Sequence, residues 1–195
     1  MTRRFPFAVW LTMLIGTSFF LGVVYQKLGF SRLLLNLLRP GLFNAQAIVS
    51  PTWIDPFVLL VVGQSNVANY GSQRGRASSG SYALATNGVF RLEDPLPGAS
   101  GTAGSPWPYW AALRQRTRPG SQIVVVSIAQ GSSSASDWID SGVHAQRLPQ
   151  VLLVLREQGL SVDAVVWHQG ETEAWTGADP VAYESALQRW IANLR

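Results

Sequence analysis

Hydrophobic residues in this chain form one long run near the start and a series of short runs further on. The short runs are continuous and rich in β-branched residues, which is typical of strands covered on both faces; they span 57–62, 123–128 and 162–167. Apolar residues at helical spacing predict helices between and after these runs, at 107–118, 143–158 and 180–194. Alternating strands and helices predict an α/β domain with a parallel sheet and right-handed crossovers.

The segments between these elements predict two loops and one further short strand. Stretches rich in small residues at 71–88 and 93–106 predict two loops, with a short strand at 89–92 between them. The pattern yields three or four strands, fewer than a complete doubly wound sheet usually has. Because the sequence stops directly after a helix, we expect the domain, residues 52–195, to be incomplete at its C-terminus.

The long apolar run, residues 5–25, contains no charged residue. About 20 apolar residues span a bilayer, and a signal-peptide core is typically about 7–15. We therefore predict that residues 1–26 form one uncleaved transmembrane signal anchor, with a cleaved signal peptide as the alternative. Residues 27–51 are interpreted as an amphipathic juxtamembrane arm, lying on the membrane or packed on the domain. Arg3 and Arg4 favour a single-pass protein whose domain is extracytoplasmic.

Charge and composition exclude several classes of function. Residues 1–50 carry five basic residues and no acid, whereas the rest carries ten basic and eleven acidic residues. The folded part therefore lacks the basic face that binds nucleic acid. The chain has no cysteine and two histidines, without the spacing of metal ligands, and it has no phosphate-loop or dinucleotide motif. We expect no metal and no cofactor.

Polar residues gather where the predicted strands end. Ser65 follows the first buried strand, so it is a candidate nucleophile, although Ser65 and Asn66 are also good helix-capping residues. Gly131 follows the second strand and lets a substrate approach its N–H, but an ordinary turn glycine is the alternative. Glu171 ends the third block and could orient a histidine, hold a substrate hydroxyl or sit in the first turn of a helix. Ligands bind at this edge in open α/β sheets.

Three sequence blocks resemble those of the SGNH hydrolase superfamily. They read Gly-Gln-Ser-Asn at 63–66, Gln-Gly-Ser-Ser at 130–133 with Trp138, and Trp-His-Gln-Gly-Glu at 167–171. The closer resemblance is to its sialate O-acetylesterase-like, carbohydrate acetylesterase branch, although Val67 stands where that branch has methionine. The resemblance implies a three-layer α/β/α sandwich with a flavodoxin-like parallel sheet.

By this resemblance the chain is a serine esterase that hydrolyses acetyl esters on carbohydrates. Ser65 is then the nucleophile, the N–H groups of Ser65 and Gly131 and the Gln169 side chain form the oxyanion hole, and Glu171 is the acidic catalytic residue. The substrate-binding residues are then expected to be Gln64, Asn66 and His168.

The catalytic histidine is the point at which this sequence departs from the resemblance. The family takes that histidine from an Asp-x-x-His segment after the last strand, so we expect it beyond residue 195. We expect His168 to be a neighbour of the site, and His144 to lie on the surface. Without the base the chain should hydrolyse poorly, and the alternative function is a catalytically inactive carbohydrate-binding or scaffolding domain anchored to the membrane.

Overall fold

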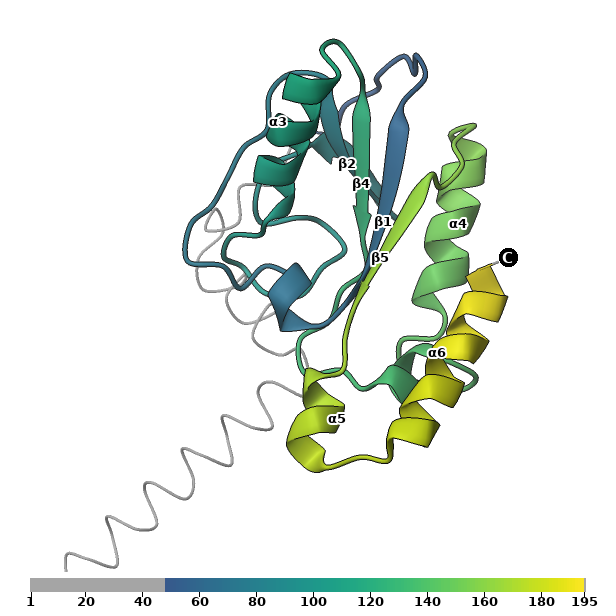
Figure 1. Ribbon diagram of the computed structural model, residues 1–195. Coiled ribbons are helices and arrows are strands. Elements are labelled where there is room, and N and C mark those ends of the chain that lie inside the picture. Colours follow the sequence, from purple (N-terminus) through teal and green to yellow (C-terminus); the bar gives the residue numbers. More distant parts are fainter. Residues whose placement is uncertain (1–47, 195) are drawn as a thin grey trace, which may run out of the picture. The chain divides into compact units, whose positions relative to one another are not determined.

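A five-stranded sheet with the strand order β3-β2-β4-β1-β5 forms the centre of the fold (Figure 1). The computed structural model describes residues 48–194. The strands are β1 (Phe57–Gly63), β2 (Ser81–Ala85), β3 (Gly88–Arg91), β4 (Ile123–Ser127) and β5 (Ala164–His168). β4 pairs in parallel with β1 and β2, β5 pairs in parallel with β1, and β3 pairs antiparallel with β2. The predicted α/β class is confirmed, but the sheet is mixed rather than wholly parallel.

The prediction of an unbroken loop over 71–88 is wrong, because this segment contains β2. Its sequence, Ser-Tyr-Ala-Leu-Ala, has too few β-branched residues to signal a strand. Ala83 and Ala85 are nevertheless buried, and Ala83 pairs with Val125 of β4. Packing against a β-branched neighbour thus overrides a weak local preference. With β2 included, the sheet has five strands instead of the predicted three or four.

The helices lie close to the positions that the sequence predicts. They are α3 (Trp107–Thr117), α4 (Arg147–Glu157), α5 (Glu171–Thr176) and α6 (Pro180–Leu194), with short 3-10 turns η1 (Ser65–Val67) and η2 (Ala135–Trp138). The predicted bounds of α6 are confirmed. α4 begins four residues later than predicted, because the His144 N–H donates to the carbonyl of Asp137 (2.7 Å) instead of starting a helix.

Alternate residues of β1 face two separate layers of helices, which together with the sheet give the predicted α/β/α arrangement. Val58, Leu60 and Val62 pack with residues of α4 and α6, including Trp190. Leu59 and Val61 pack on the other face with Trp107 and Ala111 of α3. Figure 1 shows α3 on one side of the sheet, and α4 and α6 on the other. β1, covered on both faces, places its carboxyl end between those of its parallel neighbours β4 and β5.

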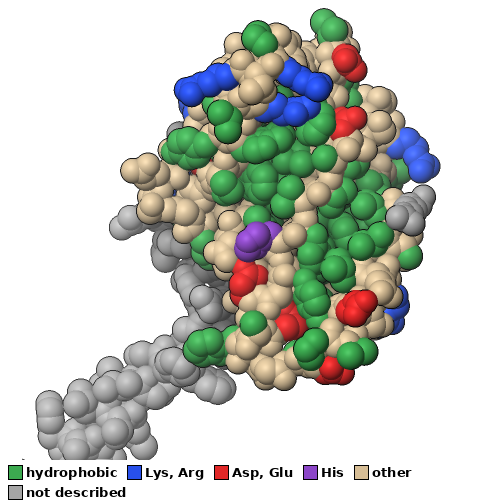
Figure 2. All heavy atoms as spheres, in the orientation of Figure 1, with side chains coloured by type: hydrophobic (Ala, Val, Ile, Leu, Met, Phe, Trp, Pro, Cys, Tyr) green, Lys and Arg blue, Asp and Glu red, His purple; other side chains and the backbone are tan. Residues whose placement is uncertain are grey.

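β5 is less covered than the other strands. Within the described residues it pairs with β1 alone, and four of its five residues are half-buried. A depression of about 550 Å³ runs beside it, lined by residues of α4, β5 and the loop that joins them, and by Leu194. Figure 2 shows hydrophobic side chains gathered over this region of the molecule.

The structured domain includes residues just upstream of Thr52. Ile48 forms a bridge with Phe90, and the Val49 N–H donates to the carbonyl of Val89 (2.8 Å), so this short segment extends the β3 edge. The predicted transmembrane segment, 1–26, and most of the predicted arm, 27–51, lie outside the described residues. Between residues 48 and 194, no helix combines the length and the apolar character needed to cross a bilayer.

Candidate active site

The three sequence blocks meet around Gly63 at the carboxyl end of β1. Gly63 pairs with His168 of β5, and the Gln64 N–H donates to the carbonyl of His168 (3.1 Å). On the other side, the Gly63 carbonyl accepts a hydrogen bond from the Gln130 N–H (2.8 Å). Residues that are far apart in sequence therefore share one sheet edge, as the sequence predicts for the ends of parallel strands.

Gly63 permits this junction because its position has no room for a side chain. A Cβ atom there would lie 1.9 Å from the carbonyl oxygen of His168, and the φ angle of Gly63 is +148°. L-residues rarely adopt that φ angle. The chain can consequently turn sharply from β1 into η1 while β5 stays in contact.

Ser65 is the first residue of η1 and is half-buried. The residue that precedes η1 is Gln64, and no side chain caps this turn, so the structure does not support the helix-capping alternative for Ser65. Ser65 lines an open groove of about 470 Å³ together with Asn66, Tyr70 and Tyr109. A serine hydroxyl in such a groove is placed where a ligand can reach it.

Glu171 connects the first block to the third. Its Oε1 accepts a hydrogen bond from Asn66 Nδ2 (2.5 Å) and lies 3.3 Å from His168 Nδ1. Glu171 is also the first residue of α5, where a helix N-terminus favours an acidic side chain. The carboxylate therefore orients Asn66 beside Ser65, and its Oε2 is buried without a partner among the described residues.

Gln64 ties the start of α5 to the end of β1. Its side chain is buried, and its Oε1 accepts hydrogen bonds from Thr172 Oγ1 (3.1 Å) and, more weakly, from the Thr172 N–H (3.4 Å). The Gln64 side chain is thus committed to holding Thr172 close to β1. The substrate-binding role predicted for Gln64 stays a prediction.

Two of the three donors predicted for the oxyanion hole, the Gly131 N–H and the Gln169 amide, are engaged within the protein. The Gly131 N–H donates to Ser100 Oγ (2.7 Å). The Gln169 Nε2 group donates to the Ser133 carbonyl (3.0 Å) and to Glu173 Oε2 (2.7 Å). A substrate oxygen can use these donors only after the Ser100 hydroxyl rotates or the Gln169 amide turns.

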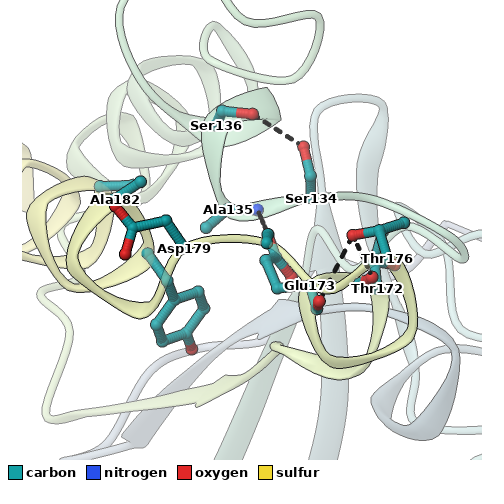
Figure 3. Close-up of a pocket in the computed structure, with 11 residues that line it drawn as sticks. Ser134, Ala135, Ser136, Thr172, Glu173, Thr176, Asp179 and Ala182 are labelled. Carbon is teal, nitrogen blue, oxygen red and sulfur yellow. Dashed lines mark hydrogen bonds between the residues drawn. The ribbon is translucent and has the colours of Figure 1, made fainter.

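Glu173 links α5 to η2, and the sequence analysis missed it (Figure 3). Its Oε1 accepts a hydrogen bond from the Ala135 N–H (2.5 Å), and its Oε2 accepts one from Gln169. Glu173 therefore positions both the Gln169 amide and the loop that carries the second block. A carboxylate in the first turn of a helix has too many ordinary uses for its position alone to have revealed this role.

Replacing Glu173 with alanine is expected to destabilise the domain by about 1–3 kcal/mol, because the buried Ala135 N–H and the Gln169 amide lose a charged acceptor. Urea unfolding of the full chain measures this change. The control is Glu184→Ala on the exposed side of α6, for which we expect less than about 0.5 kcal/mol. Equal losses for the two variants would contradict the positioning role.

His144 is half-buried, packed 5.1 Å from the Trp138 ring (centroid to centroid), rather than on the surface as predicted. Burial lowers its pKa below the usual 6.5, Arg147 lowers it further, and Asp137 raises it. Because the folded state binds the proton less readily than the unfolded state, stability should fall as the pH drops below about 6.5 and level off below the lowered pKa. We expect His144→Asn to show a smaller loss of Tm than the wild type between pH 7 and pH 5. The same pH dependence in both proteins would contradict this account.

The fold and this arrangement of blocks define an α/β protein with a serine at the end of a strand. Residues 56–195 match the family described as carbohydrate esterase, sialic acid-specific acetylesterase. The chain belongs to this carbohydrate esterase family, and the predicted resemblance is confirmed. No curated protein matches the chain.

Two solved structures are similar to this chain. A protein from Arabidopsis thaliana shares 20% sequence identity, with a TM-score of 0.60, over 72% of this chain and 68% of that one. A carbohydrate acetylesterase from Xanthomonas citri shares 21% identity, with a TM-score of 0.37, over 71% of this chain and 38% of that one. The first similarity supports the fold. Among residues 48–194, no group of three or more His, Cys, Asp or Glu side chains is arranged to hold a metal ion.

Proposed function

We propose that this protein is a serine esterase that removes acetyl groups from carbohydrates, with Ser65 as the nucleophile. The observation that carries the proposal is the position of Ser65, in an open groove at the edge where all three family blocks meet. Membership of the carbohydrate esterase family supports an acetylated carbohydrate as the substrate.

In the proposed reaction, Ser65 Oγ attacks the carbonyl carbon of the acetyl ester and loses its proton to a general base. The sugar alcohol leaves with a proton, and water then hydrolyses the acetyl-enzyme to acetate and free serine. The Ser65 N–H stabilises the oxyanion together with the Gly131 N–H and the Gln169 amide, once the latter two exchange their present partners for it. Glu171 is the acidic residue, and in the structure it holds Asn66 beside the nucleophile.

The general base is proposed to be the histidine that the resemblance assigns to an Asp-x-x-His segment beyond residue 195. Of the two histidines in this sequence, His168 belongs to the site, but its Nδ1 faces Glu171. His144 packs on Trp138.

One observation favours the alternative of a carbohydrate-binding or scaffolding domain without activity. Two of the three predicted oxyanion donors, the Gly131 N–H and the Gln169 amide, are satisfied within the protein, on Ser100, Ser133 and Glu173. An active enzyme must break these hydrogen bonds in each cycle, whereas a binding domain can keep them.

The two functions are separated by reaction with a serine-directed fluorophosphonate. For the esterase we expect, in protein that includes the proposed Asp-x-x-His segment, a covalent adduct on the peptide that contains Ser65, together with acetate release from acetylated saccharides in a pH-stat. Absence of both from that protein, with saccharide binding retained, would exclude the esterase and support the binding domain.

We also propose that residues 1–26 anchor the protein in a membrane, with the domain on the extracytoplasmic side. The absence of charge from residues 5–25 supports this. The full chain should then stay in the membrane fraction after an alkaline carbonate wash, and a chain lacking residues 1–26 should not. Release of the full chain by the wash would contradict the anchor.

A further inference from the structure

The groove beside Ser65 continues away from the nucleophile toward α3. Its lining consists of small residues, uncharged polar residues and two tyrosines. These are Ser65, Asn66, Ala68, Tyr70, Gly71, Ser72, Gln73, Ser105, Pro106 and Tyr109. A volume of about 470 Å³ is in the range of sites that bind small organic molecules. The groove is therefore large enough to take a sugar as well as the acetyl group.

Tyr70 and Tyr109 are each supported on one side and open on the other. The Tyr70 ring lies over Gly131, where a Cβ atom would be 2.7 Å from the tyrosine oxygen and 3.0 Å from the ring. The Tyr109 ring lies against Gly75, and its hydroxyl donates to the Arg74 carbonyl (3.4 Å). Both side chains remain about half exposed, at 53% and 52%. Tyrosine loses little conformational entropy when it binds a ligand, so two supported rings form a prepared contact surface.

Among residues 48–194, no charged side chain lines this groove. Arg74 is next to the lining residue Gln73 in sequence, but its guanidinium donates to the carbonyl of Thr102. Arg76 forms an ion pair with Glu93 at 2.5 Å. Recognition of a sugar carboxylate normally uses an arginine or lysine, and arginine binds it with two parallel hydrogen bonds. The lining instead offers neutral hydroxyl and amide groups, which suit the hydroxyls of an uncharged sugar.

We propose that this groove is the saccharide subsite of the protein, that it selects an uncharged acetylated sugar over an acidic one, and that Tyr70 and Tyr109 hold the sugar ring by stacking. The proposal rests on the proposed function, since it takes the groove beside Ser65 as the site where the ester lies. It adds the class of sugar and the two residues that select it. Tyr70 touches Gly131 and lies in the same groove as Ser65, so a sugar stacked on it would place an acetyl group between the first and second blocks.

Binding is measured on the full chain with Ser65→Ala, so that no ester is consumed. The probes are an O-acetylated methyl glucoside and an O-acetylated methyl glycoside of sialic acid, titrated while tryptophan fluorescence or ligand NMR signals are followed. We expect the neutral sugar to bind about tenfold more tightly, with an affinity that changes little between low and high salt. Adding Tyr70→Ala or Tyr109→Ala should weaken its binding about tenfold, whereas Tyr70→Phe should retain most of it.

The control is Leu113→Ala, one turn along α3 from Tyr109, at an exposed side chain that does not line the groove. The protein with both Ser65→Ala and Leu113→Ala should bind the neutral sugar as tightly as the protein with Ser65→Ala alone. Equal or tighter binding of the acidic sugar, or unchanged binding in both tyrosine variants, would overturn the inference. Failure of the proposed function has a different signature: sugar binding sensitive to Tyr70 and Tyr109, without acetate release from protein that has both Ser65 and the proposed histidine base, would remove the esterase and keep the subsite.

Discussion

In protein that includes the proposed histidine base, Ser65→Ala is expected to lower the rate of acetyl ester hydrolysis by roughly 10⁴–10⁶-fold, because alanine cannot form the acetyl-enzyme. The loss should appear in kcat, since the groove and the residues that hold it are unchanged. Thermal unfolding should show nearly the same Tm as the wild type, because Ser65 is half-buried and lies on a short 3-10 turn. Acetate release in a pH-stat and a melting curve on the same samples measure both quantities.

Ser161→Ala is the matched control for this substitution. Ser161 is exposed and lies just before the amino end of β5, whereas Ser65 follows the carboxyl end of β1. Loss of the Ser161 hydroxyl should leave the rate of ester hydrolysis within about twofold of the wild type, since a surface change far from the site affects neither binding nor chemistry. If Ser65→Ala kept more than a tenth of the wild-type rate, another group would be the nucleophile and the proposed mechanism would be wrong.

Gly63→Ala is expected to destabilise the domain by roughly 3–5 kcal/mol, the sum of a strained φ angle and a steric overlap. The added methyl group would lie 1.9 Å from the backbone oxygen of His168, which belongs to a neighbouring strand and cannot rotate away. Relief therefore requires β1 and β5 to separate at the site. For a domain of this size we expect Tm to fall by about 10 °C, together with loss of activity.

Gly159→Ala separates the two causes. Gly159 also has a positive φ angle, +68°, but nothing lies within 4 Å of the position that a Cβ atom would take. This variant should lose only about 1 kcal/mol, the cost of the backbone conformation. If Gly63→Ala cost no more than Gly159→Ala, the close approach of β5 to β1 would not be needed for stability.

The buried strands and longer helices followed from sequence because their patterns are local. The β-branched run of β4 and the apolar face of α6 each predict one structure over their whole length. β2 did not follow, because its alanines and serine carry no such pattern and form a strand only beside β4. The antiparallel β3 edge also depends on that pairing.

The candidate site divides in a similar way. Ser65, Gly131, Gln169 and Glu171 stand out in sequence because each ends or follows a buried strand. Ser100 accepts the hydrogen bond of the Gly131 N–H, and Glu173 accepts one from the Gln169 amide. The sequence analysis missed both of these acceptors. Neither residue is marked by its neighbours, since Ser100 lies in a loop of small residues and Glu173 in an ordinary first turn.

The sequence by itself determined the class of fold, the order of the main elements and the blocks that place the chain in its family. These features depend on residues close together in the chain, or on motifs that can be read in order. Tertiary structure alone decided the partners of each polar group, the supports of Tyr70 and Tyr109 and the neutral lining of the groove. Those features join segments 30 or more residues apart, as in the Gly131–Ser100 and Asn66–Glu171 hydrogen bonds. No local pattern specifies which of these segments will meet.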